Sequence, residues 1–182
     1  MTPGIFFDRQ LMMSLFSDMS GLLSQRGEHA QVFVVGGAAM ALAYDEKRTT
    51  QDIDGAFEPA TLVRQLAVEI AAKRGLVKDW LNDAVKGFLP GDDKNPSTVY
   101  ESEWLLVQVA SAQYLLAMKL FAARRGRDDF DCVKLFNLCG LENADDALDI
   151  LSSYYQTDLL TARHMYFAQD IAQQAALKPP AE

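Results

Sequence analysis

A short stretch with two adjacent glycines near the start of the chain constrains the fold more than any other feature. The apolar segment 31–35 ends at Gly36 and Gly37, and a run of small residues follows over 38–44. β-Branched and aromatic residues favour a buried strand, whereas alanines favour a closely packed helix. The stretch therefore predicts a strand, a sharp turn at the glycines and a helix, which together indicate an α/β unit.

An alternating acidic pair, Asp52 and Asp54, follows in a second predicted strand over 51–57. Side chains two residues apart on a strand share one face, so both carboxylates can converge on the same divalent ions. A bound cation would relieve the repulsion between two such acids in a partly apolar setting. Glycines at a strand-to-helix turn let a phosphate approach bare backbone N–H groups. The combination indicates metal-assisted nucleotidyl transfer, and the structural alternative is a strand-end pair that faces solvent.

Hydrophobic periodicity divides the chain into a mixed first part and a helical second part. The first part predicts helix, strand, helix, strand and helix, over 6–25, 31–35, 38–44, 51–57 and 59–75. A short helix or turn over 79–83, a loop over 90–96 and strands over 97–100 and 105–109 are expected next. Ser111 is a predicted N-cap, and helices are expected over 114–123, 128–138, 144–155 and 158–176.

This organisation predicts an α/β (α+β) fold, with a mixed sheet flanked by helices and a helical C-terminal half. We expect an α/β core over 1–110 and a helical part over 111–177 that packs on the core. Residues 178–182 are expected to form a frayed tail.

Composition narrows the classes of partner. The chain has 182 residues and a net charge of −8, which argues against a broad nucleic-acid-coating surface because such binding depends on phosphate neutralisation. No apolar run is long enough to span a bilayer, and no basic segment with an apolar core begins the chain. We therefore expect a cytoplasmic protein with no membrane contact. Cys132 and Cys139 lack further ligands at metal-site spacing and are expected to be small buried apolar residues.

The glycine pair and the acidic pair also carry a resemblance to a known family, together with the Arg48-Thr49 dipeptide between them. Over residues 31–57 this set resembles the signature of the polymerase-β-type nucleotidyltransferase superfamily. The Gly-Gly-Ala start and the Arg-Thr before the acids are similar to its toxin-like AbiEii and MenT branch. The resemblance implies a nucleotidyltransferase fold in which Asp52 and Asp54 hold two Mg²⁺ ions, with Mn²⁺ as an alternative. It also implies a glycine turn that contacts the triphosphate.

A second block extends the resemblance beyond the predicted sheet. It reads Lys119-Leu120-x-Ala122-x-Arg124 and continues into Arg127-Asp128-x-x-Asp131, similar to the pattern of the same toxin-like relatives. The resemblance implies that Lys119 contacts phosphate, that Asp128 or Asp131 completes the acidic set and that Arg124 adds a nucleotide contact. The structural alternative is a helix end with basic residues, followed by acids that cap the next helix.

Two further positions bear on this interpretation. Gln108 stands in the strand predicted over 105–109, where the superfamily pattern has a third carboxylate. The run 79–82 is similar to small proteins of the same branch, and Asn82 is a candidate substrate contact. Trp80 could stack on a base, but a buried core indole is the favoured interpretation.

Together, the residues and the resemblance predict an Mg²⁺-dependent nucleotidyltransferase. It would move a nucleoside monophosphate from an NTP to RNA, for example to a tRNA, or to a protein hydroxyl, as the toxin of a toxin–antitoxin or defence system. The predicted catalytic residues are Asp52, Asp54, Lys119 and Asp128, and the predicted nucleotide contacts are Gly36, Gly37, Arg48, Thr49, Asn82 and Arg124. The alternative is a catalytically inert module that binds a nucleotide or a protein, acting as an antitoxin or as the partner of a toxin.

Overall fold

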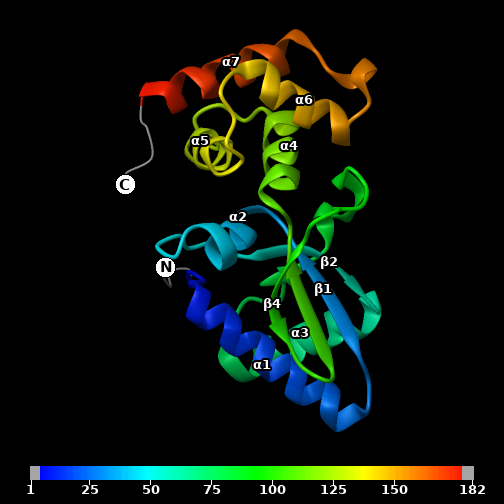
Figure 1. Cartoon of the computed structure of the whole chain (residues 1–182). Coiled ribbons are helices and arrows are strands. Elements are labelled where there is room, and N and C mark those ends of the chain that lie inside the picture. Colours follow the sequence, from blue (N-terminus) through cyan, green and yellow to red (C-terminus); the bar gives the residue numbers. More distant parts are fainter. Residues whose placement is uncertain (1–4, 178–182) are drawn as a thin grey trace. The chain divides into compact units, whose positions relative to one another are not determined.

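The computed structural model describes residues 5–177, which divide into two compact units (Figure 1). Unit 1 comprises the residues up to Phe88 together with Asn95–Ala110, and unit 2 comprises Leu89–Lys94 and the residues from Ser111 onward. Unit 1 holds the sheet, and the described part of unit 2 is built from helices. The fold is therefore α+β with a helical C-terminal half, which confirms the predicted fold class. The predicted tail over 178–182 lies outside the described residues.

The elements follow the chain with short connections. Those of unit 1 are α1 (Arg9–Arg26), β1 (Ala30–Val34), α2 (Gly36–Ala39), the π-helical turn η1 (Met40–Tyr44), β2 (Ile53–Glu58), α3 (Ala60–Arg74), β3 (Leu81–Asn82), the 3₁₀ turn η2 (Ala84–Phe88), β4 (Ser97–Glu101) and β5 (Leu105–Val109). Those of unit 2 are α4 (Ala112–Ala122), α5 (Asp129–Leu138), α6 (Ala144–Tyr154), the 3₁₀ turn η3 (Thr157–Leu159) and α7 (Ala162–Leu177).

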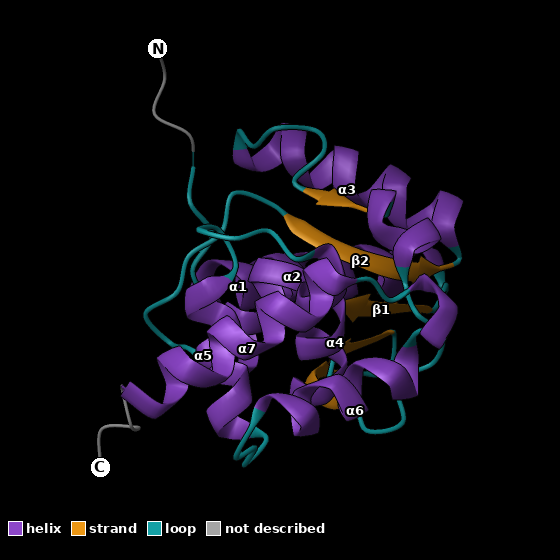
Figure 2. Ribbon diagram, turned by 90° about the horizontal axis from the view of Figure 1, so that it is seen from above, coloured by secondary structure: helices purple, strands orange, loops and turns teal. Residues whose placement is uncertain are grey.

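The sheet of unit 1 has five strands in the order β3-β2-β1-β5-β4. The central strand β1 pairs antiparallel with β2 and parallel with β5, while β3 runs parallel to β2 and β4 antiparallel to β5. Figure 2 shows β1 and β2 side by side in this sheet. The antiparallel pairing with β2 brings the beginning of β2 to the end of β1.

Local sequence signals mark the first or last residues of several of these helices. Gly27 and Gly75 follow α1 and α3 in the left-handed conformation, with φ of 65° and 68°, which glycine adopts without steric cost. Ser111 caps α4 through its side chain, which accepts a hydrogen bond from the Tyr114 backbone N–H. Asn143 and Asp146 form a reciprocal capping box at the start of α6. These ends agree with the sequence patterns because each depends on a few neighbouring residues.

One face of the sheet carries the core of unit 1. Along β1 and β5 alternate side chains are buried: Val32, Val34, Leu105, Val107 and Val109. α1 contacts β5, α3 contacts β2, and the two helices contact each other, so both cover this buried face. Burial of each large apolar side chain contributes roughly 1.5–3 kcal/mol. Within unit 1 these two helices leave the opposite face of the sheet uncovered, and that face carries Asp54, Ala56 and Gln108.

The structure corrects three of the predicted boundaries. The helix after the first strand begins at Gly36 rather than at residue 38, because the glycines themselves enter the first turn. The segment predicted as a short helix or turn over 79–83 contains strand β3, which pairs with β2. The last helix begins at Ala162 rather than at residue 158, because the 3₁₀ turn η3 precedes it.

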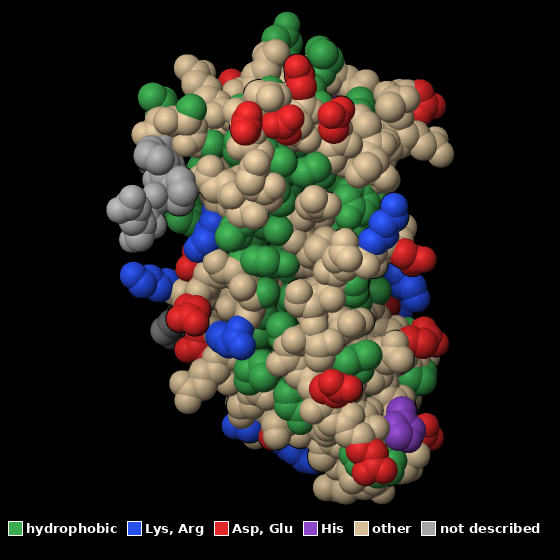
Figure 3. All heavy atoms as spheres, viewed as in Figure 1, with side chains coloured by type: hydrophobic (Ala, Val, Ile, Leu, Met, Phe, Trp, Pro, Cys, Tyr) green, Lys and Arg blue, Asp and Glu red, His purple; other side chains and the backbone are tan. Residues whose placement is uncertain are grey.

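The surface agrees with the acidic composition. On the face shown in Figure 3, Lys and Arg side chains are scattered singly among acidic ones, outside the atoms drawn in grey. The net charge of −8 is therefore not offset by a broad basic surface on this face. Among residues 5–177, no helix combines the length and the apolar character needed to cross a membrane.

Candidate functional site

The glycine pair and the acidic pair meet at one end of the sheet. In the antiparallel register Val34 lies opposite Gly55, so the next residue along β1 lies beside Asp54. The backbone N–H of Val35 donates a hydrogen bond to the Asp54 carbonyl oxygen at 2.9 Å. The glycine turn and the acidic pair are about fifteen residues apart in the sequence. The pairing of β1 with β2 thus makes them neighbours in the fold.

Gly36 and Gly37 present bare backbone to this corner. Gly36 has φ +66°, and a Cβ built on it would lie 3.5 Å from the Asp54 Oδ2 atom. A Cβ on Gly37 would lie 3.0 Å from the Thr50 Oγ1 atom, which is closer than ordinary van der Waals contact. The positive φ favours glycine at position 36, where a Cβ would be in ordinary contact with the Asp54 carboxylate, and a side chain at position 37 would crowd the Thr50 hydroxyl.

A third glycine, Gly55, was not singled out by the sequence analysis. A Cβ built on Gly55 would lie only 2.6 Å from the Phe33 carbonyl oxygen on β1. No side chain fits at that distance, so Gly55 allows β1 and β2 to approach closely next to Asp54. Its position inside the Asp-x-Asp-Gly sequence is a signal, because glycine in a strand often marks a close approach of two backbones.

The two carboxylates lie at the start of β2, Asp54 within the strand and Asp52 just before it. Ile53 is fully buried, Asp54 is half-buried, and Asp52 is exposed just before the strand begins. Because side chains alternate along a strand, Asp54 lies on the side opposite Ile53, whereas Asp52 lies in the bend before β2 begins. The strand predicted over 51–57 thus begins two residues later than expected, and a shared face for the two carboxylates stays a prediction.

The donor set suits a metal that arrives with a phosphate ligand. Over residues 5–177, no group of three or more His, Cys, Asp or Glu side chains is arranged to hold a metal ion. Mg²⁺ commonly takes one or two carboxylates from a protein and completes its shell with water and substrate phosphates. Asp54, next to Gly36, could supply one such carboxylate, and Asp52 lies two residues before it in the chain.

The loop before β2 supplies Arg48 and Thr49. The Arg48 backbone N–H donates to the Asp45 carbonyl oxygen at 2.9 Å, and the guanidinium Nε is enclosed by protein. Thr49 is exposed, whereas Thr50 exchanges backbone hydrogen bonds of 2.7 and 3.0 Å with Phe7. This bridge ties the loop to the segment before α1 and holds it beside the glycine turn.

Strand β3 brings the predicted contact Asn82 next to the acids. In the parallel register Asn82 lies opposite Asp54, and its Oδ1 atom accepts a hydrogen bond from the Ala84 N–H at 3.2 Å. Trp80 is fully buried, donates from Nε1 to the Ala67 carbonyl oxygen at 2.9 Å and stacks on Phe7. Trp80 is therefore a core indole, as the favoured interpretation of the sequence had it.

Gln108 lies on the same face of the sheet as Asp54. Phe33 is paired with both Ala56 on β2 and Gln108 on β5, and residues paired across strands point to the same side. The Gln108 Nε2 atom donates to the Thr98 Oγ1 atom at 3.4 Å. At the position where the superfamily pattern has a third carboxylate, this chain thus has a neutral amide on the same sheet face as Asp54.

Unit 2 contains the second predicted cluster in a buried ion network. The Lys119 Nζ atom at the end of α4 lies 3.0 Å from carboxylate oxygens of both Asp128 and Asp131. Arg124 makes two further hydrogen bonds to Asp128, at 2.7 and 3.2 Å. Lys119, Asp128 and Asp131 are 7%, 3% and 2% exposed. Within unit 2 these four residues join the end of α4 to the start of α5.

The network sets the charge state of Asp128. Burial alone would raise the pKa of Asp128, but the hydrogen bond from Arg124 and the positive charge of Lys119 outweigh it, and its pKa lies below the ordinary value. Asp128 is therefore ionised at neutral pH and compensates the buried Lys119 ammonium. Asp128 makes no side-chain cap hydrogen bond to α5, so its carboxylate serves the ion network rather than the predicted cap, and the predicted catalytic roles stay predictions.

Comparison with known proteins bears on unit 1. Residues 10–90 match the model of a family described as "Nucleotidyltransferase of unknown function (DUF6036)". No curated protein and no solved structure shows a significant match. The matched stretch contains the glycine turn, Arg48, Asp52, Asp54 and Asn82, and it ends before β5 and the helices of unit 2. The similarity to a nucleotidyltransferase family is therefore confined to residues 10–90.

Proposed function

We propose that the protein is an Mg²⁺-dependent nucleotidyltransferase that moves a nucleoside monophosphate from an NTP to a hydroxyl group. The observation that carries the proposal is the approach of Gly36 to Asp54, with a Cβ at Gly36 only 3.5 Å from the Asp54 carboxylate. A bare turn beside two carboxylates offers room for phosphate and a ligand set for its counter-ion. The match of residues 10–90 to a nucleotidyltransferase family supports the same class of reaction.

The residues take the following roles in the proposal. Asp52 and Asp54 hold two Mg²⁺ ions, or Mn²⁺, and Gly36 and Gly37 leave space for the phosphates. When bound, the metal neutralises charge on the triphosphate and on the leaving pyrophosphate. The remaining nucleotide contacts come from Arg48, Thr49, Asn82 and Arg124. Lys119 and Asp128 are proposed to contribute to catalysis, with Asp131 as the alternative to Asp128.

The proposed transfer needs no covalent enzyme intermediate. An acceptor hydroxyl oxygen forms a bond to the α-phosphorus of the NTP, and the bond from that phosphorus to the β-phosphate oxygen breaks. Pyrophosphate leaves, and the hydroxyl proton passes to solvent. The acceptor is RNA, for example the 3′ end of a tRNA, or a protein hydroxyl.

We further propose that this activity belongs to the toxin of a toxin–antitoxin or defence system, with a cognate antitoxin as protein partner. The support is the similarity of the Gly-Gly-Ala, Arg-Thr and Lys-Leu-x-Ala-x-Arg motifs to the AbiEii and MenT branch. The second candidate function is an inert nucleotide- or protein-binding module. The amide of Gln108, on the face where the superfamily pattern has a third carboxylate, favours that candidate.

A labelling assay tests the proposed activity. The protein is incubated with each α-labelled NTP, Mg²⁺ and total RNA, beside the variant Asp54→Asn and the control variant Asp79→Asn. Asp79 is an exposed carboxylate of unit 1 outside the proposed site. Loss of a metal ligand removes several kcal/mol of charge stabilisation, so we expect Asp54→Asn to lower transfer by about 100-fold or more. Asp79→Asn should retain transfer.

The outcomes separate the two candidate functions. Label in RNA or in protein with the unmodified chain and with Asp79→Asn alone supports the enzyme and identifies the acceptor. Absence of label with every NTP, together with a rise in melting temperature on addition of Mg²⁺-NTP, supports the binding module, since a ligand stabilises the state that it binds. Absence of both effects contradicts both functions.

A further inference from the structure

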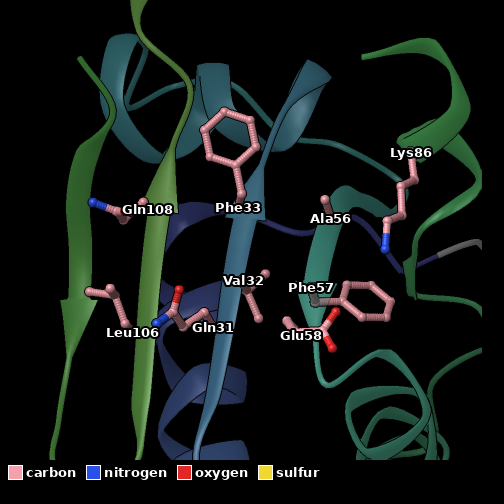
Figure 4. Close-up of a pocket in the computed structure, with 9 residues that line it drawn as sticks. All are labelled: Gln31, Val32, Phe33, Ala56, Phe57, Glu58, Lys86, Leu106 and Gln108. Atoms are coloured by element: carbon pink, nitrogen blue, oxygen red, sulfur yellow. The ribbon is translucent and has the colours of Figure 1, made fainter. Parts of the chain in front are cut away.

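A pocket of about 190 Å³ opens on the uncovered face of the sheet, in the middle of unit 1 (Figure 4). Its floor is the central strand β1 with its neighbours β2 and β5, and η2 contributes a wall. Figure 4 shows Lys86 extending from η2 toward β2, while Gln31 and Gln108 project from β1 and β5. The pocket and the Asp54 carboxylate lie on one face, because Ala56 in the pocket is two residues further along the same strand.

The position of the pocket excludes recognition by strand addition. β1 is the central strand of the five, with β2 on one side and β5 on the other, so its backbone hydrogen-bonding groups are used within the sheet. A ligand on this floor must therefore be recognised by side chains. An extended peptide would instead seek an unpaired sheet edge.

The side chains offer complementary chemistry for a flat ring with polar edges. The Gln31 carboxamide offers a donor and an acceptor. Gln108 is its diagonal neighbour, since Gln31 is paired with Leu106 on β5, and the Gln108 amide extends toward β4, where its Nε2 atom donates to Thr98. Phe33, which is paired with Gln108 and follows Gln31 by two residues on β1, supplies an aromatic surface, and aromatic rings stack on nucleobases without preference for sequence. Gln is a recurrent reader of base edges through its amide.

Size and spacing narrow the ligand further. Pockets for whole drug-sized molecules are about 300–1,000 Å³, so 190 Å³ suits one ring system rather than a complete nucleotide. Asp54 and Ala56 are separated by two strand residues, or about 7 Å. This spacing leaves room for one sugar between a ring in the pocket and a phosphate at the glycine turn.

We propose that this pocket receives the nucleobase of a nucleotide whose phosphate lies at the Gly36–Asp54 corner. The inference rests on the proposed function and deepens it, because it assigns base recognition to Gln31, Gln108 and Phe33. The Glu58 carboxylate and the Lys86 ammonium at the pocket add one acceptor and one donor to the base edge. In this proposal, the side chains that line the pocket determine which nucleobase the protein prefers.

Nucleosides without phosphate test the pocket separately from transfer. Adenosine, guanosine, cytidine and uridine are titrated to about 10 mM, above a dissociation constant of about 1 mM that corresponds to roughly 4 kcal/mol. The readout is the NMR signals of the side-chain amides of Gln31 and Gln108. We expect at least one nucleoside to shift both signals in a saturable way, while ribose shifts neither.

Variants identify the side chains that bind. Gln108→Leu should weaken nucleoside binding about fivefold to tenfold, the value of one hydrogen bond of about 1–1.5 kcal/mol. Gln65→Leu on α3 is the matched control, because Gln65 is exposed outside the pocket. Ala56→Leu fills the pocket and should abolish binding while the circular-dichroism spectrum is kept. This second variant keeps the proposal testable if Gln108→Leu misfolds.

The outcomes for the pocket and for the enzyme are distinct. Nucleoside binding that survives Asp54→Asn, together with absence of transfer, supports the pocket and contradicts the enzyme. Transfer without any shift at Gln31 and Gln108, or nucleoside binding that Ala56→Leu leaves unchanged, overturns the pocket and leaves the enzyme standing. Absence of shifts with all four nucleosides overturns the pocket whatever the transfer assay shows.

Discussion

The variant Lys119→Met probes the buried ion network of unit 2 in isolation. The Lys119 ammonium contacts both Asp128 and Asp131 at 3.0 Å, and all three side chains are less than a tenth exposed. Methionine keeps most of the apolar stem of lysine and removes its charge. The substitution therefore leaves packing nearly intact and takes the shared counter-ion from two buried carboxylates.

The expected loss of stability is large because the two buried carboxylates cannot be solvated by water once the ammonium is removed. Removal of one partner from a buried ion pair costs about 3–5 kcal/mol. The contacts of Arg124 with Asp128 reduce the loss, since Asp128 keeps one cation in the variant. We therefore expect the free energy of unfolding to fall by about 3 kcal/mol at pH 7. The exposed pair Arg125–Asp170 is the control, and its removal should lower the free energy of unfolding by at most about 1 kcal/mol.

The pH dependence provides an independent check. The pKa of Asp128 is lowered in the folded protein, so its pairing stabilises the fold above the pKa of the unfolded chain, near 4. That contribution disappears as the pH falls through the folded pKa. Without Lys119 the folded pKa rises, and the variant loses less stability on acidification. The difference between the two proteins should therefore narrow as the pH falls below about 4.

Urea unfolding followed by circular dichroism measures these free energies. The control variant is Arg125→Met, and the double variant Lys119→Met/Asp131→Asn should recover part of the loss, because a neutral amide no longer needs the ammonium. A loss below 1 kcal/mol for Lys119→Met, or a difference independent of pH, would refute the reasoning. Such a result would also favour a catalytic rather than a structural role for Lys119.

Three further predictions concern single positions. Gly55→Ala places a Cβ 2.6 Å from the Phe33 carbonyl oxygen, so the free energy of unfolding in urea should fall by about 1–3 kcal/mol or more. The control Gly21→Ala has open space around its Cβ in α1 and should raise the free energy of unfolding by about 0.5–1 kcal/mol. Ser111→Ala removes the cap of α4 and its hydrogen bond to Asp93, and should lower stability by about 1 kcal/mol; an unchanged urea midpoint would contradict this. Burial raises the pKa of Cys139 to about 11, so its rate of alkylation should increase about tenfold per pH unit from pH 8 to pH 10, and a plateau near pH 9 would show that the thiol is not buried.

The sequence by itself determined the features that depend on near neighbours. The glycine turn and the cap at Ser111 were predicted because each involves only a few consecutive residues. The placement of Asp54 on the side opposite the buried Ile53 follows in the same way from strand geometry. The family resemblance of residues 31–57 depends on these local features, and the fold class could be predicted from them.

Tertiary structure decided what depends on residues distant in the chain. The two residues of β3 have no strand pattern of their own and become a strand because β2 supplies hydrogen-bond partners, which brings Asn82 opposite Asp54. The need for Gly55 arises from the approach of β1, and the charge balance of Lys119 arises from the packing of α4 against α5. The pocket on the open sheet face combines residues from three strands and η2. Such arrangements are set by strand register and helix packing, which neither local propensity nor periodicity encodes.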